Sequence, residues 1–509
     1  MTSNLRHWAT HFPDRLAARI GSDSMSYGSL ESRANQLAHA FEHLGLVRGD
    51  HIVGFLPNTT FMFVLVWAAY RSGLYFTPAS TSLSLADAAY IVNNSQAKLV
   101  LADKAVKTAV PDLPALCDGG IHWFSHGEAM PGYKPVQALM DAMNTLPRAV
   151  EYPGSLMLYT SGTTGSPKGV WRPLPAADYL GPPTFAADLM ALFSLDERVR
   201  YMSTAPLYHA APLRFALTVT AVGGTVIGLP KFDAEEALRT VVEERITHSQ
   251  WVPTMLQRVL RLPEETRRNF RAPEHVMALH SAAPCPVPVK HAIIDWWGPI
   301  LMEYYSGTEG VGLTMLDSLE WLKHPGSVGK TFKGVPHVLD DAWAELPAGE
   351  SGRIYFSGIT PFQYFGDPEK TANRTSPQGY QTLGDIGYLD GEGYMYLTDR
   401  MDDMIISGGV NIYPQEIESA IMDLPCIVDT GVVGAADEEF GERPVAFVVG
   451  DGKHSYAELE MLLKSHCETS LGRIKSPARY VVLEQMPRSP TGKLLRRDLR
   501  DMLKSTQAV

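Results

Sequence analysis

Cysteine is scarce in this chain of 509 residues, in which only Cys117, Cys285, Cys426 and Cys467 occur. No two of them stand in the CxxC spacing that zinc sites and dithiol redox sites use. The scarcity argues against a disulfide framework and predicts that the protein works in a reducing compartment. We expect all four thiols to be unpaired and without a catalytic role.

Long apolar runs are also missing. Residues 1–17 contain no apolar core of the kind that defines a secretory signal peptide. The most apolar run, residues 61–70 (FMFVLVWAAY), is too short to cross a bilayer, which takes about 20 residues. We therefore expect a buried helix over residues 61–70, no integral membrane segment and a cytoplasmic location.

Positive charge is in deficit, because 44 Lys and Arg stand against 56 Asp and Glu, which gives a net charge of −12. This balance disfavours non-specific binding to nucleic acid or to an anionic membrane, so no nucleic-acid partner is expected. Hydrophobic residues make up 45% and charged residues 20%, as in ordinary globular proteins. A chain of 509 residues is too long for one core, so two or three domains are expected.

Glycine, serine and threonine are concentrated in residues 158–170, which read LYTSGTTGSPKGV. Gly162, Gly165 and Gly169 allow positive φ and a close approach of the backbone to a ligand. Lys168 adds one positive charge, and such a loop suits the β- and γ-phosphates of a nucleotide. It is not a Walker A loop, because Lys168 is followed by Gly169 and not by Ser or Thr. Thr160, Ser161, Thr163 and Thr164 add hydroxyl side chains to the stretch.

Residues 159–169 (YTSGTTGSPKG) resemble the phosphate-loop signature of the adenylate-forming superfamily. That superfamily includes acyl-CoA synthetases, luciferases and the adenylation domains of peptide synthetases. Six motifs match in order, and the resemblance covers roughly residues 30–499. It implies ATP, Mg²⁺ and coenzyme A as cofactors and a small-molecule carboxylic acid as substrate, and it leaves a homodimer open.

Joining a carboxylate to the α-phosphate of ATP brings two anions together, so the site must supply positive charge, a metal and orientation. In the YYSGTEG motif, Glu309 is a hard oxygen ligand suited to Mg²⁺, and the resemblance adds Thr164 as a metal ligand. Thr308 can donate to the α-phosphate, and Tyr305 offers a flat face for adenine. Ser306 stands where the superfamily usually has Gly. The resemblance assigns further residues to the nucleotide: Ser281, Ala282, Ala283, Tyr304, Ser306 and Gly307.

Three charged residues later in the chain complete the predicted adenylation site. Asp385, on a Gly-flanked turn in TLGDIGYLD, can accept from both ribose hydroxyls and matches the superfamily's Thr-Gly-Asp position, with Leu383 inserted. Arg400 is predicted as a second ribose or phosphate contact. Lys493 stands in a Pro-Thr-Gly-Lys segment, and the resemblance implies that it swings into the site and drives adenylation. The alternative for Lys493 is a basic solvated tail.

The acyl pocket is predicted from one polar residue and several apolar segments. His209, in PLYH, matches a position that lies beside the acyl carboxylate in relatives. Trp251, Gly310, Val311 and Gly312 are candidate pocket walls. Since Gly310 and Gly312 leave room and the walls carry few charges, we expect an apolar acid that is medium-chain, long-chain, aromatic or polycyclic.

The thioester step has its own candidates. The resemblance places Gly408 and Gly409, in IISGGVN, along the pantetheine arm of coenzyme A, and Phe440 and Lys475 at coenzyme A contacts. Two glycines in a strand-like run cost roughly 0.5–1 kcal/mol each, which a required space for a ligand explains. The alternative is a β-bulge or tight bend that needs Gly for backbone reasons.

Strands predicted at residues 51–56, 74–78 and 98–102 alternate with helices, the pattern of a parallel sheet with helices on both faces. The alternation returns after residue 200. Residues 106–148 are weakly patterned and indicate loops and short helices, whereas residues 349–358 and 387–398 indicate antiparallel strands.

The expected fold class is α/β, with a large N-terminal domain and a small mobile α+β C-terminal domain. The N-terminal domain, residues 1–398, is expected to hold stacked, mostly parallel sheets with helices and a β-barrel-like subdomain. Residues 399–402 join it to residues 403–509. In the superfamily a hinge lies here and the small domain turns between two catalytic poses, with Asp402 at the hinge position; the alternative is an ordinary charged linker.

The preferred interpretation is an acyl-CoA synthetase that forms acyl-AMP and then acyl-CoA. One rival is a stand-alone or peptide-synthetase-type adenylation enzyme, against which stand the absence of a following carrier domain and of an Asp in residues 208–217. A second is a luciferase-like oxygenase, which light emission or oxygen uptake would reveal. A third is a binding protein with reduced catalysis, and a fourth is a ligase that performs one half-reaction with a separate partner.

Overall fold

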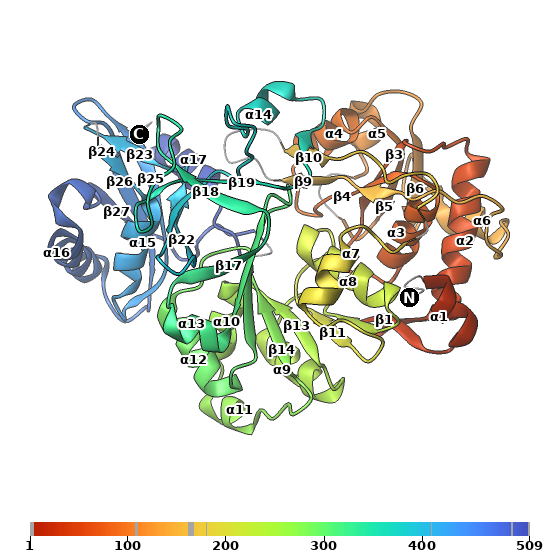
Figure 1. The fold of residues 1–509 in the computed structure, drawn as a ribbon, viewed down its shortest axis with the longest axis horizontal. Helices are drawn as coiled ribbons and strands as arrows, with labels where there is room; N and C mark the ends of the chain where they lie inside the picture. Colours follow the sequence, from red (N-terminus) through yellow and green to blue (C-terminus); the bar gives the residue numbers. More distant parts are fainter. Residues whose placement is uncertain are drawn as a thin grey trace.

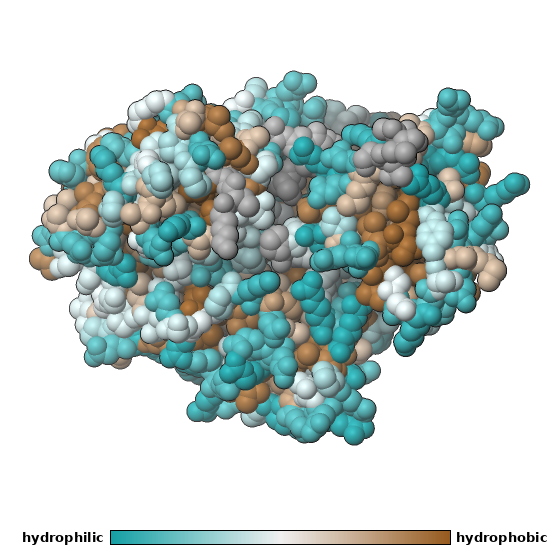
Figure 2. Space-filling view, turned by 180° about the vertical axis from the view of Figure 1, so that it is seen from behind, coloured by the Kyte–Doolittle hydropathy of each residue, from teal (hydrophilic) through white to brown (hydrophobic). Residues whose placement is uncertain are grey.

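The computed structural model describes residues 5–106, 110–160, 167–179, 181–408, 410–489 and 492–506. Figure 1 shows a large N-terminal part, coloured red to green, and a smaller C-terminal part in blue at one end of the molecule. Seen from behind, hydrophilic residues cover much of the surface (Figure 2). Buried apolar side chains form separate clusters in the two parts of the chain. Within the described residues, no helix combines the length and apolarity that crossing a membrane requires.

The first sheet has six strands in the order β7-β6-β5-β3-β4-β8, all paired in parallel. Helix α3 (Phe61–Arg71) connects β3 to β4 and is buried along almost its whole length, as its apolar run predicts. The strands are β3 (His51–Phe55), β4 (Tyr75–Pro78), β5 (Ala97–Asp103), β6 (His122–His126), β7 (Lys134–Pro135) and β8 (Ser155–Leu156).

Strand β6 corrects the expectation of only loops and short helices over residues 106–148. Its sequence HWFSH shows no clean alternation of apolar and polar residues, so the pattern did not reveal it. It becomes a strand because the edge of β5 supplies its hydrogen bonds, from Leu99↔His122 to Asp103↔His126. The short helices expected in this region are present as α5 (Leu113–Leu116) and α6 (Val136–Asp141).

The second sheet has thirteen strands in the order β18-β19-β21-β22-β17-β16-β15-β14-β13-β11-β12-β1-β2. Its pairings from β1 through β12, β11, β13 and β14 to β15 are parallel. These strands are β1 (Leu16–Ile20), β11 (Arg200–Ser203), β12 (Thr225–Gly228), β13 (His248–Trp251), β14 (Met277–His280) and β15 (Leu301–Tyr305). Helices between or after them include α8 (Ala210–Ala221), α9 (Ala234–Glu243), α10 (Pro253–Leu260) and α12 (Val287–Trp297).

The carboxyl ends of neighbouring parallel strands meet at one edge of a sheet, which is where ligands bind in open α/β folds. His209 follows β11, Trp251 ends β13, Ser281 follows β14 and Tyr305 ends β15. The topology therefore brings four segments that the motifs singled out to the same edge.

The sheet changes to antiparallel pairing at β16 and remains so to β18. These strands are β16 (Leu313–Asp317), β17 (Ser327–Lys333), β18 (Val335–Leu339), β19 (Gly352–Ser357), β21 (Asp385–Leu389) and β22 (Met395–Arg400). With the small sheet of β9 (Leu158–Thr160), β10 (Lys168–Trp171) and β20 (Gln363–Tyr364), they contribute to a core that contains Val170, Phe356 and Met395. The antiparallel strands expected over residues 349–358 and 387–398 are present, whereas the barrel-like closure of this subdomain stays a prediction.

The C-terminal part is a compact α+β unit around its own core, which includes Ile405, Ile417 and Leu463. Its sheet comprises β23 (Ile405–Ser407), β24 (Val410–Ile412), β25 (Ile427–Asp437), β26 (Gly441–Gly450) and β27 (Arg479–Val482). Its helices are α15 (Pro414–Met422), α16 (Tyr456–Lys475) and α17 (Arg496–Thr506). The chain therefore has a large N-terminal domain and a small α+β C-terminal domain, as expected.

The other elements are short or peripheral to the site. They are α1 (Leu5–His11), β2 (Asp23–Ser26), α2 (Tyr27–His43), α4 (Leu85–Asn94), α7 (Ala186–Leu192), α11 (Glu264–Asn269), α13 (Ser318–Lys323) and α14 (Pro368–Ala372). Ser26 is the N-cap of α2, and its hydroxyl accepts from the Ser29 N–H.

Candidate active site

The Gly/Ser/Thr-rich stretch is held between two paired strands. Thr160 in β9 lies opposite Lys168 in β10, so the ends of the loop are fixed side by side. The Lys168 ammonium lies over the ring of Tyr364, 5.3 Å from its centroid, and burial lowers the pKa of Lys168. The predicted loop residues Ser161, Gly162, Thr163, Thr164 and Gly165 lie outside the described residues.

The turn after β15 brings the predicted adenine and ribose residues together. The Tyr305 hydroxyl donates to Asp385 Oδ2 at 2.6 Å, although 80 residues separate them. Ser306 donates to the Gly312 carbonyl at 2.9 Å, so its hydroxyl is used inside the turn. A Cβ on Gly307 would lie 2.5 Å from Leu383 Cδ2, which explains why this position has no side chain.

Asp385 and Arg400 are partners across the β21–β22 ladder. Arg400 Nε lies 3.3 Å from Asp385 Oδ1, and Arg400 Nη2 donates to the Leu383 carbonyl at 3.0 Å. Leu383, the inserted residue, is buried in the subdomain core and places its carbonyl toward Arg400. The structure therefore gathers Tyr305, Asp385 and Arg400, as the motifs predict.

Glu309 is fixed by two neighbours that come from distant strands. The Tyr364 hydroxyl donates to Glu309 Oε1 at 2.9 Å, and the Arg172 guanidinium donates to the Glu309 carbonyl. In the described part of the chain, no group of three or more His, Cys, Asp or Glu side chains could hold a metal by itself. A single carboxylate still fits Mg²⁺, which is commonly held by one or two carboxylates, substrate phosphates and water.

Lys493 lies among the charges of the nucleotide residues. Burial, and next the Arg400 charge, lower the pKa of Lys493, while the carboxylates of Asp403, Glu309 and Asp385 oppose that shift. A lysine that interacts with all of these groups does not belong to a solvated tail. The alternative of a basic solvated tail is therefore wrong for Lys493.

The loop that carries Lys493 is seated on the large domain through Gly492. Gly492 has φ of 74°, and a Cβ there would lie 2.0 Å from Thr254 Oγ1 on α10. After this loop, Arg496 and Arg500 bind Asp403, with N–O distances of 3.2 and 3.0 Å. The loop and α17 are thus packed, and Lys493 is held at the site by backbone contact.

The predicted hinge is fixed by polar contacts on both sides. Arg374 of the large domain lies 2.5 Å from Asp402 Oδ2. Asp399 is buried, accepts from the Gln415 N–H of the small domain at 3.0 Å, and has its pKa raised to about 6 by that burial. The role of Asp402 as a hinge stays a prediction.

His209 caps the start of α8 and lies with its ring against Tyr208. Burial lowers the pKa of His209 to about 4, so the imidazole is neutral at ordinary pH. Its Nε2 atom is buried and has no hydrogen-bond partner among the described residues. This nitrogen is available to a polar group of a ligand.

The other predicted pocket residues have structural surroundings of their own. Trp251 is 1% exposed, packs against Trp297 and donates from Nε1 to Ser249 Oγ at 2.6 Å. Val311 is fully buried in the subdomain core. Their place in the acyl pocket stays a prediction.

Gly310 and Gly312 lack side chains for a reason other than the expected room for the acid. Both have positive φ, 61° and 68°. A Cβ on Gly310 would lie 3.3 Å from the Arg172 guanidinium, and one on Gly312 would lie 2.4 Å from the Phe356 ring. The space beside each glycine is filled by protein, so the inference of a roomy pocket from these two residues is corrected.

Ser281, Ala282 and Ala283 follow β14 at the same edge. Ala282 has φ of 78°, a left-handed conformation that a residue with a Cβ rarely adopts. Tyr304, before the YSGTEG turn, accepts from Gln250 Nε2 at 2.8 Å, and burial raises its pKa to about 12. Tyr304 is therefore an un-ionised, bonded support for this edge.

The predicted coenzyme A residues form a separate group. The Gly408 N–H donates to the Phe440 carbonyl at 2.8 Å, and a Cβ on Gly408 would lie 3.1 Å from the Phe440 ring. Lys475 pairs with Glu416 at 2.7 Å, and Gly409 lies outside the described residues. Figure 1 shows β23 and β24 well away from β9 and β10, the strands on either side of the predicted phosphate loop.

Two functional candidates were missed by sequence reasoning, namely Arg172 and Arg214. Arg214 donates to the Thr308 carbonyl at 3.3 Å, and Arg172 contacts the next carbonyl, that of Glu309. Arg214 is the only charged residue in α8, which reads AAPLRFALTVTA. A lone charge in a buried apolar helix was the signal that could have found it.

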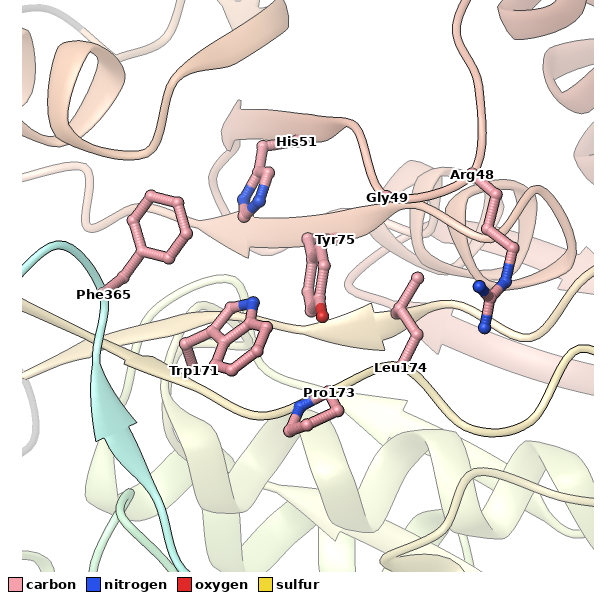
Figure 3. Close-up of a pocket in the computed structure, with 8 residues that line it drawn as sticks. All are labelled: Arg48, Gly49, His51, Tyr75, Trp171, Pro173, Leu174 and Phe365. Atoms are coloured by element: carbon pink, nitrogen blue, oxygen red, sulfur yellow. The ribbon is translucent and has the colours of Figure 1, made fainter.

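A surface hollow of about 490 Å³ lies beside the end of β10, on the side away from the Thr308–Glu309 turn. Figure 3 shows the rings of His51, Tyr75, Trp171 and Phe365 turned toward it. None of the site residues predicted from the sequence lines it. Successive side chains of a strand point to opposite faces, so Trp171 faces the hollow while Arg172 faces the Thr308–Glu309 turn.

Comparisons with known proteins agree with this geometry. The family model described as AMP-binding enzyme matches residues 5–364, and the one described as AMP-binding enzyme C-terminal domain matches residues 416–493. The long-chain-fatty-acid–CoA ligase FadD13 of Mycobacterium tuberculosis is 31% identical over 99% of this chain and 98% of its own length. The 2-succinylbenzoate–CoA ligase of Bacillus licheniformis is 28% identical over 97% of this chain and 98% of its own.

A solved structure extends the agreement to the whole fold. The o-succinylbenzoate CoA synthetase MenE from Bacillus subtilis, in complex with the acyl-adenylate intermediate OSB-AMP, superposes with a TM-score of 0.82 at 25% identity. The match covers 98% of each chain. The two family models, which together match most of the chain, and the relative at 31% identity lead to one conclusion: the chain belongs to the AMP-binding enzyme family.

Proposed function

We propose that this protein is an AMP-forming acyl-CoA ligase. In the first step, an oxygen of the acid's carboxylate attacks the α-phosphorus of ATP, the bond to the bridging oxygen breaks, and pyrophosphate leaves. In the second, the sulfur of coenzyme A attacks the acyl carbonyl, and AMP leaves with the electrons of the broken C–O bond. The proposal rests mainly on Lys493. Its loop is seated against Thr254 through Gly492, and the charges of Glu309, Asp385 and Arg400 act on its ammonium group.

The nucleotide is held by residues that are already in contact with each other. Asp385, bonded to Tyr305 and Arg400, accepts from the ribose hydroxyls, and Tyr305 lies against the adenine. Lys168 has no carboxylate within salt-bridge distance among the described residues, so its charge is available to the phosphates. Lys493 adds positive charge where the carboxylate and the α-phosphate meet, the place of greatest repulsion.

Glu309 would hold Mg²⁺, together with Thr164 of the phosphate loop. The Tyr364 hydroxyl donates to Oε1 of Glu309, so Oε2 can bind a metal ion. Oxygen atoms of carboxylates are ligands that Mg²⁺ prefers. A bound Mg²⁺ neutralises phosphate charge and orients the leaving pyrophosphate. Thr308, whose carbonyl is fixed by Arg214, lies next to Glu309 to meet the α-phosphate.

The second step requires the other pose of the small domain. We assign residues 1–398 to the large domain, 399–402 to the joint with Asp402 as hinge, and 403–509 to the small domain. Rotation would exchange Lys493 for the surface around Gly408, Gly409 and Phe440, which would line the pantetheine arm. Lys475 would leave Glu416 to bind a phosphate of coenzyme A. The homodimer and the cytoplasmic location stay predictions.

The acid has an apolar body. The relatives named for long-chain fatty acids and for 2-succinylbenzoate both activate carboxylic acids with extensive hydrocarbon, which supports this choice. His209 Nε2, neutral and without a partner among the described residues, is placed to receive a hydrogen bond or to donate one to the reacting carboxylate.

The test separates the two half-reactions. Pyrophosphate release reports adenylation, and thioester formation from supplied acyl-AMP reports the second step. Lys493→Ala should lower pyrophosphate release by on the order of 10²–10³ and leave the second step nearly unchanged. Lys504→Ala, an exposed lysine of α17 paired with Asp501, is the matched control and should change neither. Equal loss of both steps in Lys493→Ala, or no pyrophosphate release with any acid, would refute the proposal.

A further inference from the structure

Two arginine side chains converge on the turn that carries Thr308 and Glu309. Arg214, from α8, reaches the Thr308 carbonyl at 3.3 Å. Arg172, directly after β10, donates to the Glu309 carbonyl and lies 3.3 Å from the position of a Cβ on Gly310. Two positive charges thus lie side by side at the reaction edge of the large sheet.

Neither guanidinium has a carboxylate of its own. Among the described residues, no Asp or Glu side chain lies within 4.0 Å of either one, and the residues outside the described ranges include no Asp or Glu. Three buried or partly buried arginines elsewhere are paired with carboxylates: Arg71 with Glu31 at 2.7 Å, Arg374 with Asp402 at 2.5 Å and Arg496 with Glu418 at 2.5 Å. Arg172 and Arg214 have carbonyl oxygens as their partners instead.

The pair is electrostatically incomplete. Arg214 Nε is buried and has no hydrogen-bond partner among the described residues. Burial, and next the charge of Arg172, lower the pKa of Arg214 to about 10, which still leaves it charged at neutral pH. The Glu309 carboxylate opposes the pKa shift of both arginines, but it lies more than 4.0 Å from either guanidinium. Keeping two partly buried cations together is unfavourable unless an anion joins them, so the pair calls for a closer anion than Glu309.

The position of the pair favours the acid over the nucleotide as the source of that anion. Arg214 lies five residues after His209, the cap of the same helix, and none of the predicted nucleotide residues lies on α8. Both His209 Nε2 and Arg214 Nε lack partners among the described residues. One short stretch thus presents two unsatisfied polar atoms to the acyl side.

Arg172 is held in place from both faces of the sheet. The Tyr75 hydroxyl, at the hollow of Figure 3, donates to the Arg172 carbonyl at 2.8 Å. Its guanidinium is bonded to the Glu309 carbonyl on the opposite face. A side chain fixed in this way is suited to select a ligand group, because little conformational entropy remains to be lost on binding.

We propose that Arg172 and Arg214 form a second anion-binding subsite, and that the acid activated by this enzyme is a dicarboxylic acid with an apolar body. One carboxylate reacts with ATP, and the other is bound by the two guanidinium groups. This inference rests on the proposed function and narrows its substrate class. Arg172 and Arg214 determine specificity and do not take part in bond formation.

The test compares each dicarboxylic acid with its own monomethyl ester, which keeps the length and removes one charge. A series of α,ω-dicarboxylic and aromatic dicarboxylic acids is assayed by pyrophosphate release. We expect kcat/KM for the best diacid to exceed that of its ester by at least about tenfold, because a buried polar subsite strongly rejects an analogue without the matching group. The diacid should also raise the melting temperature of the unmodified protein more than the ester does.

Variants of the two arginines complete the test. Arg214→Met and Arg172→Met remove contacts to the Thr308 and Glu309 carbonyls and should slow both substrates, but kcat/KM for the diacid should fall at least about tenfold further than that for the ester, so that the preference is lost. Arg214→Lys should keep part of the preference. Arg258→Met is the matched control on α10, where Arg258 is exposed, and should change nothing. The melting comparison on the unmodified protein decides the matter even where a Met variant does not fold.

The outcomes are distinguishable. Equal loss with diacid and ester would show that the arginines hold the reacting carboxylate or only support the turn, and would overturn the inference. A protein that activates monocarboxylic acids but prefers no diacid would overturn the inference and leave the proposed function intact. Absence of pyrophosphate release with every acid would remove the proposed function itself.

Discussion

The contact between Gly492 and Thr254 offers a sharp test of how the small domain is seated. Gly492 combines a left-handed φ of 74° with a Cβ position that lies 2.0 Å from Thr254 Oγ1 and 3.1 Å from both Thr254 Cβ and Cγ2. Rotating the threonine about χ1 gives only partial relief, because its Cβ does not move and would stay 3.1 Å from the new Cβ, tighter than ordinary van der Waals contact. Gly492→Ala should therefore push the Lys493 loop off α10.

The expected magnitude has two parts. A residue with a Cβ in the left-handed region costs about 1–2 kcal/mol. Overpacking against Thr254 adds about 1–3 kcal/mol. The sum of about 2–5 kcal/mol corresponds to a loss between about 30-fold and a few thousand-fold in the rate of acyl-AMP formation. The thioester step should be unaffected, since it uses the pose in which this loop has left the site.

The assay measures pyrophosphate release, thioester formation from supplied acyl-AMP, and a melting curve on one preparation. Gly472→Ala is the matched control, because Gly472 has the same φ of 74° in the same domain and nothing within 4 Å of its Cβ position. It should lower the melting temperature by a similar amount and leave adenylation intact. The double variant Gly492→Ala, Thr254→Ala should recover the packing part of the loss and keep the backbone part.

Two results would refute this reasoning. If Gly492→Ala adenylates at the parent rate, the loop is not seated on Thr254 when the reaction occurs. If it slows both half-reactions equally and melts far below Gly472→Ala, the glycine serves the folding of the small domain and the docking argument is wrong.

Three further predictions concern single residues of the site. Asp385→Ala removes the partner of Tyr305 and Arg400 and should raise KM for ATP by roughly 10- to 150-fold, because a hydrogen bond to a charged group is worth about 1.5–3 kcal/mol. An unchanged KM would show that Asp385 does not bind ATP. Because burial lowers the pKa of His209 to about 4, the pH profile of adenylation should show no titration of His209 near pH 6.5, and a rate change near pH 6.5 that disappears in His209→Gln would contradict this. The stability that the neutral, buried His209 contributes should be lost as the pH falls from about 6.5 to about 4. Ala282→Gly should leave stability unchanged or raise it by up to about 1 kcal/mol, whereas Ala283→Gly, without positive φ, should lower it by about 0.4–1 kcal/mol, as thermal melting can show.

Local patterns were sufficient for most of the fold. Buried strands such as β3 and β5 read as short apolar runs, and α3 reads as an unbroken apolar helix, because burial on all sides needs no polar face. The sequence did not predict β6, because a strand near the edge of a sheet depends more on pairing with its neighbour than on its own residue pattern. The motifs around Glu309, Asp385 and Lys493 were readable because each concentrates Gly with one functional side chain.

The sequence by itself therefore determined the fold class, the family resemblance and the chemical types of residue at the site. Only the tertiary structure decided which residues meet and why certain glycines are needed: Tyr305 with Asp385, Arg400 with Asp385, and Gly492 against Thr254. It also revealed Arg172 and Arg214, each an ordinary charge in the sequence, as neighbours without carboxylates. The physical reason is that periodicity and composition act over a few residues, whereas burial, ion pairing and steric fit depend on atoms brought together from segments far apart in the chain.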